Sequence, residues 1–143
     1  MLLIIKSTAL LVLPLCLAIA QDQPYTPGAG SRERRAIVDA LRPPVQRQLK
    51  KKVIFKIEHL RVQGDWAFMR GVPQQPGGGA MSYRGTVYQT AIDAGAFDDG
   101  IVALLRRRGG KWQVVRYVIG ATDVPYVEWD KEYHAPPTIF QEP

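Results

Sequence analysis

The feature that most constrains the fold is a pair of β-rich runs joined by Gly109-Gly110. The first run, IVALLRRR, spans 101–108, and the second, KWQVVRYVI, spans 111–119. Two consecutive glycines supply the positive φ angles that a two-residue hairpin turn requires. We therefore expect an antiparallel hairpin here, with its turn at the two glycines.

This turn also predicts the register of the hairpin. The base is apolar on both faces and the tip is basic on both faces, so we expect a buried base and a tip that projects into solvent. Arg107 opposite Trp112 can form a cation–π pair, which contributes about 0.5–1 kcal/mol at an exposed site. The predicted pairs are Arg108 with Lys111, Arg107 with Trp112, Leu105 with Val114, and Ile101 with Val118.

A second hairpin is predicted just before the long proline- and glycine-rich loop at 73–79. The run 53–62 alternates in polarity, and 66–72 is its return strand after a turn at 63–65. With an uninterrupted alternation, Phe55, Ile57 and His59 share one face of the strand.

The segment 31–49 is predicted to be helical. Ile37, Leu41 and Val45 recur at a spacing of four, and Ser31 suits the N-cap. Pro43-Pro44 predicts either a kink or a helix that ends near Leu41 and restarts. The lysines at 50–52 suit the C-terminus of the helix, where cations are favoured.

Two further segments are harder to interpret. Residues 83–90, YRGTVYQT, fit a short strand, whereas 88–97, YQTAIDAGAF, fit a short helix that ends before a turn at 98–100. The stretch that follows Gly120 predicts a final helix, capped by Thr122 or Asp123 and containing Trp129.

The N-terminus has the pattern of a secretory signal peptide in residues 1–20. An apolar run follows Lys6 and ends in Ala18-Ile19-Ala20, which has small residues at the two positions that a signal peptidase reads. We expect a flexible leader at 21–30 and one domain at 31–140. The protein is then secreted or periplasmic, with no transmembrane anchor after the signal is removed.

The order of elements predicts an α+β fold, with an N-terminal helix packed on a curved antiparallel sheet built from hairpins and a short C-terminal helix. The segments LRVQGDWAFM, FDDGIVALLRRRGGKWQVVRYVIGATDV and EWDKEYHAP resemble a family of small secreted bacterial proteins of unknown function. More loosely, a helix on a curved sheet resembles the cystatin-like superfamily, including nuclear transport factor 2-like domains. Neither resemblance supplies catalytic residues.

The residue content argues against several chemistries. The only cysteine, Cys16, lies in the predicted signal peptide, so the mature chain has no disulfide and no thiolate site. Neither Ser31 nor Ser82 lies in a nucleophile elbow, and neither His59 nor His134 has a metal-ligand partner at helical spacing. We expect neither a metal nor a cofactor.

The chain carries a formal net charge of +6, which favours an anionic partner. We expect a small, secreted, non-enzymatic binding domain with a basic surface, whose partner is a protein or an anionic component of the cell envelope; export argues against nucleic acid. The candidate partner-binding residues are Arg106, Arg107, Arg108 and Lys111. The alternative is an acid/base enzyme of the isomerase or dehydratase type, with a cavity in a cystatin-like cup; its candidate catalytic residues are His59, Asp93 and Tyr83.

Overall fold

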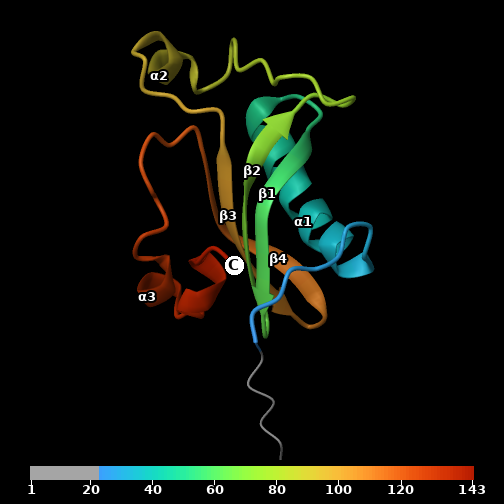
Figure 1. Cartoon of the computed structure of the whole chain (residues 1–143). Coiled ribbons are helices and arrows are strands. Elements are labelled where there is room, and N and C mark those ends of the chain that lie inside the picture. Colours follow the sequence, from blue (N-terminus) through green and yellow to red (C-terminus); the bar gives the residue numbers. More distant parts are fainter. Residues whose placement is uncertain (1–22) are drawn as a thin grey trace, which may run out of the picture.

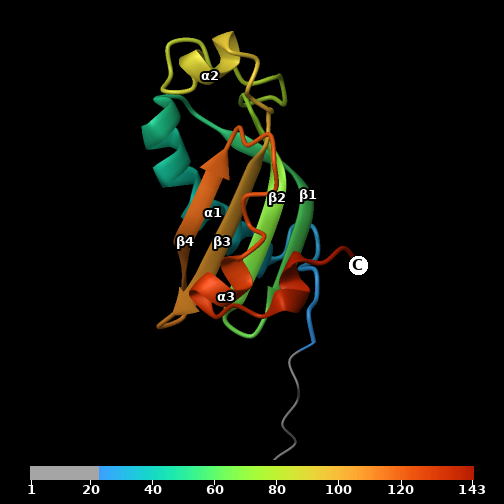
Figure 2. The ribbon, with the colours of Figure 1, turned by 90° about the vertical axis from the view of Figure 1, so that its left-hand side faces the viewer.

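Four antiparallel strands form one open, curved sheet in the order β1-β2-β3-β4, which is also their order in the chain. The computed structural model describes residues 23–143. Helix α1 covers one face of the sheet and the C-terminal segment covers the other (Figures 1 and 2). The predicted α+β class is confirmed. The elements are α1 (Arg32–Leu49), β1 (Ile54–Gln63), β2 (Trp66–Gln74), α2 (Gln89–Asp93), β3 (Ile101–Arg108), β4 (Lys111–Ile119), α3 (Trp129–Tyr133) and the 3-10 helix η1 (Pro137–Phe140).

Helix α1 buries the predicted apolar stripe against the sheet. Ser31 caps the helix by accepting a hydrogen bond from the Arg34 N–H at 3.1 Å. The helix runs through Pro43 and Pro44 without ending. A proline inside a helix costs about 3 kcal/mol, and here the fully buried residues on both sides of the pair, Leu41 and Val45, offset that cost.

The β1–β2 hairpin forms as predicted, but a β-bulge at Glu58 changes its faces. Ile57 pairs with Gly71, and His59 pairs with Arg70, so one residue of β1 is left over between them. A bulge inserts one residue and shifts the alternation. Phe55 and Ile57 therefore pack in the α1 core, whereas His59 lies on the opposite face against Phe68. The prediction that these three residues share a face is wrong.

A second bulge lies in the β3–β4 hairpin. Gly109 and Gly110 make the turn with φ of 56° and 75°, and the pairs nearest the tip match the predicted register. Beyond Leu105 the register shifts, so that Ile101 pairs with Ile119 rather than with Val118. The extra residue is Val115, and its insertion brings Arg116 to the face of α3.

The C-terminal segment builds a second core on the face opposite α1. Trp129 is 1% exposed and lies against Phe68 at 6.4 Å between ring centroids. The final helix begins at Trp129, later than predicted, because the preceding valines have no core to pack on: Val124 is 51% and Val127 64% exposed.

The segment between β2 and β3 contains helix α2 but no strand at 83–90, so the helical interpretation is the correct one. Tyr83 and Tyr88 turn inward, and each packs against Phe97, at 4.7 and 5.6 Å between ring centroids. In a strand, Tyr83 and Tyr88 would lie on opposite faces, because they are five residues apart. A turn instead allows both rings to pack against Phe97.

The segment that precedes α1 packs against the edge of the sheet at β1. The backbone of Tyr25 pairs with Val62 of β1 through two hydrogen bonds of 2.8 and 2.9 Å. Pro27 is buried and its carbonyl accepts a bond from Arg34 at 3.3 Å. Part of the segment that we expected to be a flexible leader therefore contacts the domain at these residues. The predicted signal peptide lies outside the described residues.

Within residues 23–143, none of the helices has both the length and the apolar content needed to cross a membrane.

Candidate functional site: two basic regions

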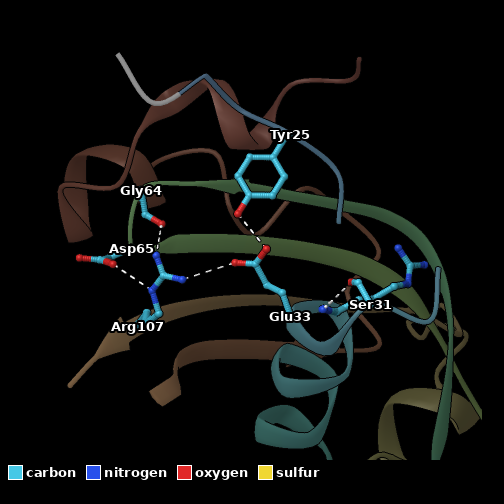
Figure 3. A network of polar contacts seen from close by, with 7 residues as sticks. Tyr25, Ser31, Glu33, Gly64, Asp65 and Arg107 are labelled. Carbon is cyan, nitrogen blue, oxygen red and sulfur yellow. Dashed lines mark hydrogen bonds and ion pairs between the residues drawn. The ribbon is translucent and has the colours of Figure 1, made fainter. Parts of the chain in front are cut away.

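The arginines of the β3–β4 turn lie at one end of the sheet, and Arg106 and Arg107 make contacts within the fold. Arg107 donates to the Asp65 carboxylate at 3.1 Å, to the Gly64 carbonyl at 3.3 Å and to Glu33 at 3.5 Å (Figure 3). Its guanidinium also lies over the ring of Trp112, 5.2 Å from the centroid, as predicted. Arg107 therefore joins both hairpin turns to the first turn of α1.

The other candidates at this tip divide into two pairs. Arg106 lies over the ring of Trp66 at 4.9 Å, so it is also engaged within the fold. Arg108 and Lys111 face each other across the turn and are exposed. Of the four predicted partner-binding residues, only these two present their charge to solvent without an internal contact among the described residues.

A second basic region lies at the other end of the sheet, where α1 ends beside the loop that carries α2 (Figures 1 and 2). We call it the lysine end: Lys50, Lys51, Lys52 and Arg84. Lys51 donates from Nζ to the Ser82 carbonyl. The other three are exposed, and within residues 23–143 none of the four forms an ion pair.

Two neighbouring hollows lie between these cations. One, of about 160 Å³, is lined by Lys50, Lys51 and Arg84 together with Thr86 and Val87. The other, of about 370 Å³, is lined by Lys51 and Lys52 together with residues of the 75–82 loop. Neither hollow has a carboxylate in its wall. The arrangement suits an anion.

Hydrogen bonds hold the loop of Arg84 against α1. Gln48 donates to the Tyr88 hydroxyl at 2.6 Å, and the Tyr117 hydroxyl donates to the other atom of the same amide. Burial raises the pKa of Tyr88 to about 12, so its hydroxyl stays protonated and neutral at physiological pH. The sequence favoured a solvated helix end over a binding patch for the lysine run. It gave no sign of Arg84, which is far from the lysines in the chain and is brought there only by tertiary contacts.

The three candidate catalytic residues lie in different places. His59 is 5% exposed, contacts the Ile139 carbonyl through Nε2 at 2.9 Å, and has its pKa lowered by burial. Tyr83 lies in the α1 core and donates to Asp99 at 2.7 Å, while burial raises its pKa. Asp93 is exposed and accepts a bond from Gln89. The cavity beside Tyr83 is lined by neither His59 nor Asp93.

The remaining polar candidates have structural positions. His134 is exposed and ends α3 in the left-handed conformation, with φ of 56°. The turn predicted at 98–100 forms, and the Gly100 N–H donates to the Asp98 carbonyl at 2.8 Å. In the part of the chain that the structure describes, no group of three or more potential metal ligands lies together.

Comparisons of the chain with protein-family models, with curated proteins and with solved structures found no match.

Proposed function

We propose that this chain is an exported, non-enzymatic binding domain that holds an anionic component of the cell envelope at its lysine end. The observation that carries the proposal is the pair of hollows lined by lysine and arginine with no carboxylate in either wall. A cluster of like charge without counter-charges attracts anions and raises their local concentration.

The surroundings of the two basic regions support this choice of surface. At the hairpin tip, Asp65 and Glu33 already neutralise the charge of Arg107. At the lysine end, Lys50, Lys52 and Arg84 are exposed and have no such partner among the described residues. Two of the four cations of the first region are therefore bound within the fold, whereas three of the four at the lysine end are exposed and unpaired among the described residues.

The nature of the partner follows from the predicted export. A chain that leaves the cytoplasm with a cleaved signal peptide meets phosphorylated lipids and acidic polymers of the envelope. Lysine ammonium groups bind phosphate as point charges and do not require the planar geometry of a carboxylate. A phosphoryl group is therefore the anion that this region fits best.

The proposal is tested with vesicles of phosphatidylcholine with and without phosphatidylglycerol. Wild-type protein should sediment with the anionic vesicles at low salt and lose binding as salt rises, since exposed charges are screened over about 8–10 Å at physiological ionic strength. The Lys50→Glu/Lys52→Glu variant should lose this binding. The Arg108→Glu/Lys111→Glu variant changes the net charge equally and should retain most of it.

A second arm uses soluble inorganic polyphosphate, which separates a phosphoryl site from a requirement for a bilayer. Polyphosphate should compete with the vesicles for the wild-type protein. Equal loss in the two double variants would show that only net charge matters, and absence of salt-sensitive binding to both probes would contradict the proposal.

A further inference from the structure

Two buried arginine nitrogens have no hydrogen-bond partner. They are the Nε atoms of Arg61 and Arg70. Among the described residues, no other buried side-chain nitrogen or oxygen lacks a hydrogen-bond partner. Buried polar groups are satisfied in the great majority of native proteins, so each exception asks for an explanation. Arg70 pairs with His59 across β1 and β2, and both arginines lie close enough to His59 to lower its pKa.

One carboxylate of the chain already lies at this site. Glu142 pairs with Nη2 of Arg70, and its other oxygen is 3.6 Å from Nδ1 of His59. The side chain of Glu142 is 67% exposed. Glu142 contacts only Nη2 of the Arg70 guanidinium and leaves Nε without a partner. An arginine can donate two parallel hydrogen bonds to the two oxygens of one carboxylate.

A cavity of about 240 Å³ opens beside Arg70 on the same face of the sheet, under the loop that leads to α3. Its apolar wall comes from both the sheet and the loop. Two exposed carboxylates, Glu58 and Asp123, also line it. Arg70 is thus a cation in the wall of a pocket that is apolar on one part of its surface and polar on the rest. The apolar lining is formed by Ile101, Val102, Val118, Val124, Pro125 and Tyr126.

We propose that this cavity binds a small organic monocarboxylate, whose carboxylate pairs with Nε and Nη2 of Arg70 in place of Glu142 and whose apolar body fills the pocket. Glu58 and Asp123 repel a second negative charge, so a dicarboxylate binds less well. The site is separate from the lysine end, and Glu142 acts as an internal competitor for it.

The test is calorimetric titration of the full chain with hexanoate, hexanamide and adipate. Hexanoate should bind, and hexanamide should bind at least about tenfold more weakly, because hydrogen bonds to a charged group contribute more than about 1.4 kcal/mol. Adipate should also bind more weakly than hexanoate. Equal affinity for hexanoate and hexanamide would overturn the proposal.

Two variants locate the site. Glu142→Gln removes the competing charge and should tighten hexanoate binding about threefold to tenfold, a gain that a damaged fold would not produce. Arg70→Lys should weaken binding by about tenfold, because lysine lacks the fork. Arg116→Lys, on the same face but paired with Glu132, is the matched control and should leave the affinity unchanged. Failure of hexanoate to bind both wild type and Glu142→Gln would refute the site.

Discussion

The arginines of the β3–β4 turn and the lysines at the end of α1 are both short basic runs, and their surroundings differ. Arg107 meets two carboxylates from distant parts of the chain and, across its own hairpin, the ring of Trp112. Lys50 and Lys52 meet none of these among the described residues. A basic run in a sequence therefore does not indicate a binding surface until the positions of the acidic and aromatic residues are known.

The chemistry of the two cations fits this division. A guanidinium is planar, stacks on aromatic rings and donates in several directions, so Arg107 can satisfy three acceptors while it lies over Trp112. An ammonium is a compact and strongly hydrated charge. The lysine end keeps its charge near water, where a ligand can reach it.

The largest expected effect on stability comes from two tryptophans that each lie beneath an arginine, Trp129 beneath Arg116 and Trp66 beneath Arg106. Trp129→Ala should cost about 3–5 kcal/mol of unfolding free energy, because the side chain is fully buried in the second core. Trp66 is only half-buried under Arg106, so Trp66→Ala should cost less, about 1–2 kcal/mol. Urea unfolding of both variants measures the difference; equal losses would contradict it.

The next prediction compares the stability of two variants at neighbouring arginines, Arg107 and Arg108. Arg107→Glu places a third carboxylate beside Asp65 and Glu33, and should destabilise the fold by about 2 kcal/mol. Arg108→Glu, one residue further along and exposed, should change stability by less than about 0.5 kcal/mol. Thermal unfolding of the two variants is the measurement. A similar stability for both would show that the contacts in Figure 3 contribute little.

Much of the fold could be predicted from the sequence, because its signals are local. Gly109-Gly110 defines a turn, and the apolar stripe of α1 defines a buried helix face. The bulges at Glu58 and Val115 could not be predicted, since nothing in the alternation marks an inserted residue. Their consequence is large: they decide that His59 and Arg116 lie on the face of the C-terminal segment.

The candidate sites were less predictable than the fold, because their residues are far apart in the chain and come together only in the tertiary structure. The arginine run was conspicuous, but its partners Asp65 and Glu33 are 42 and 74 residues away. The lysine end needs Arg84, and the arginine site on the sheet needs Glu142, and in each case only tertiary structure makes the contact. Separation along the chain, rather than residue type, set the limit of prediction.

A smaller effect concerns the pH dependence of stability, to which the buried His59 contributes. Burial lowers the pKa of His59 below its ordinary 6.5 in the folded state. The unfolded chain then binds more protons below pH 6.5, so stability should be full above this pH and fall as the pH is lowered towards 5. Urea unfolding across this range measures the decline.

The variant His59→Gln separates this contribution from those of the carboxylates. It should be less stable at pH 7.5, because it disturbs the contact with the Ile139 carbonyl, but it should lose less stability on acidification than the wild type. A decline of equal size in both proteins would assign the pH dependence to other groups.

The smallest effect on stability tests whether the lysine end is kept for binding. Lys50 has φ of 54°, a left-handed conformation that glycine adopts without strain and that commonly ends a helix. Lys50→Gly should therefore stabilise the protein by roughly 0.5–1 kcal/mol, while it removes one cation from the hollow beside Arg84. Lys52→Gly removes a charge from the neighbouring hollow at a residue without a positive φ, so it should weaken vesicle binding with no gain in stability. A gain in stability together with a loss of vesicle binding would show that the charge of Lys50 serves binding at a cost in stability. If Lys50→Gly is more stable and still binds anionic vesicles like the wild type, the lysine end is only a solvated helix terminus and the contrast with the arginine tip loses its functional meaning.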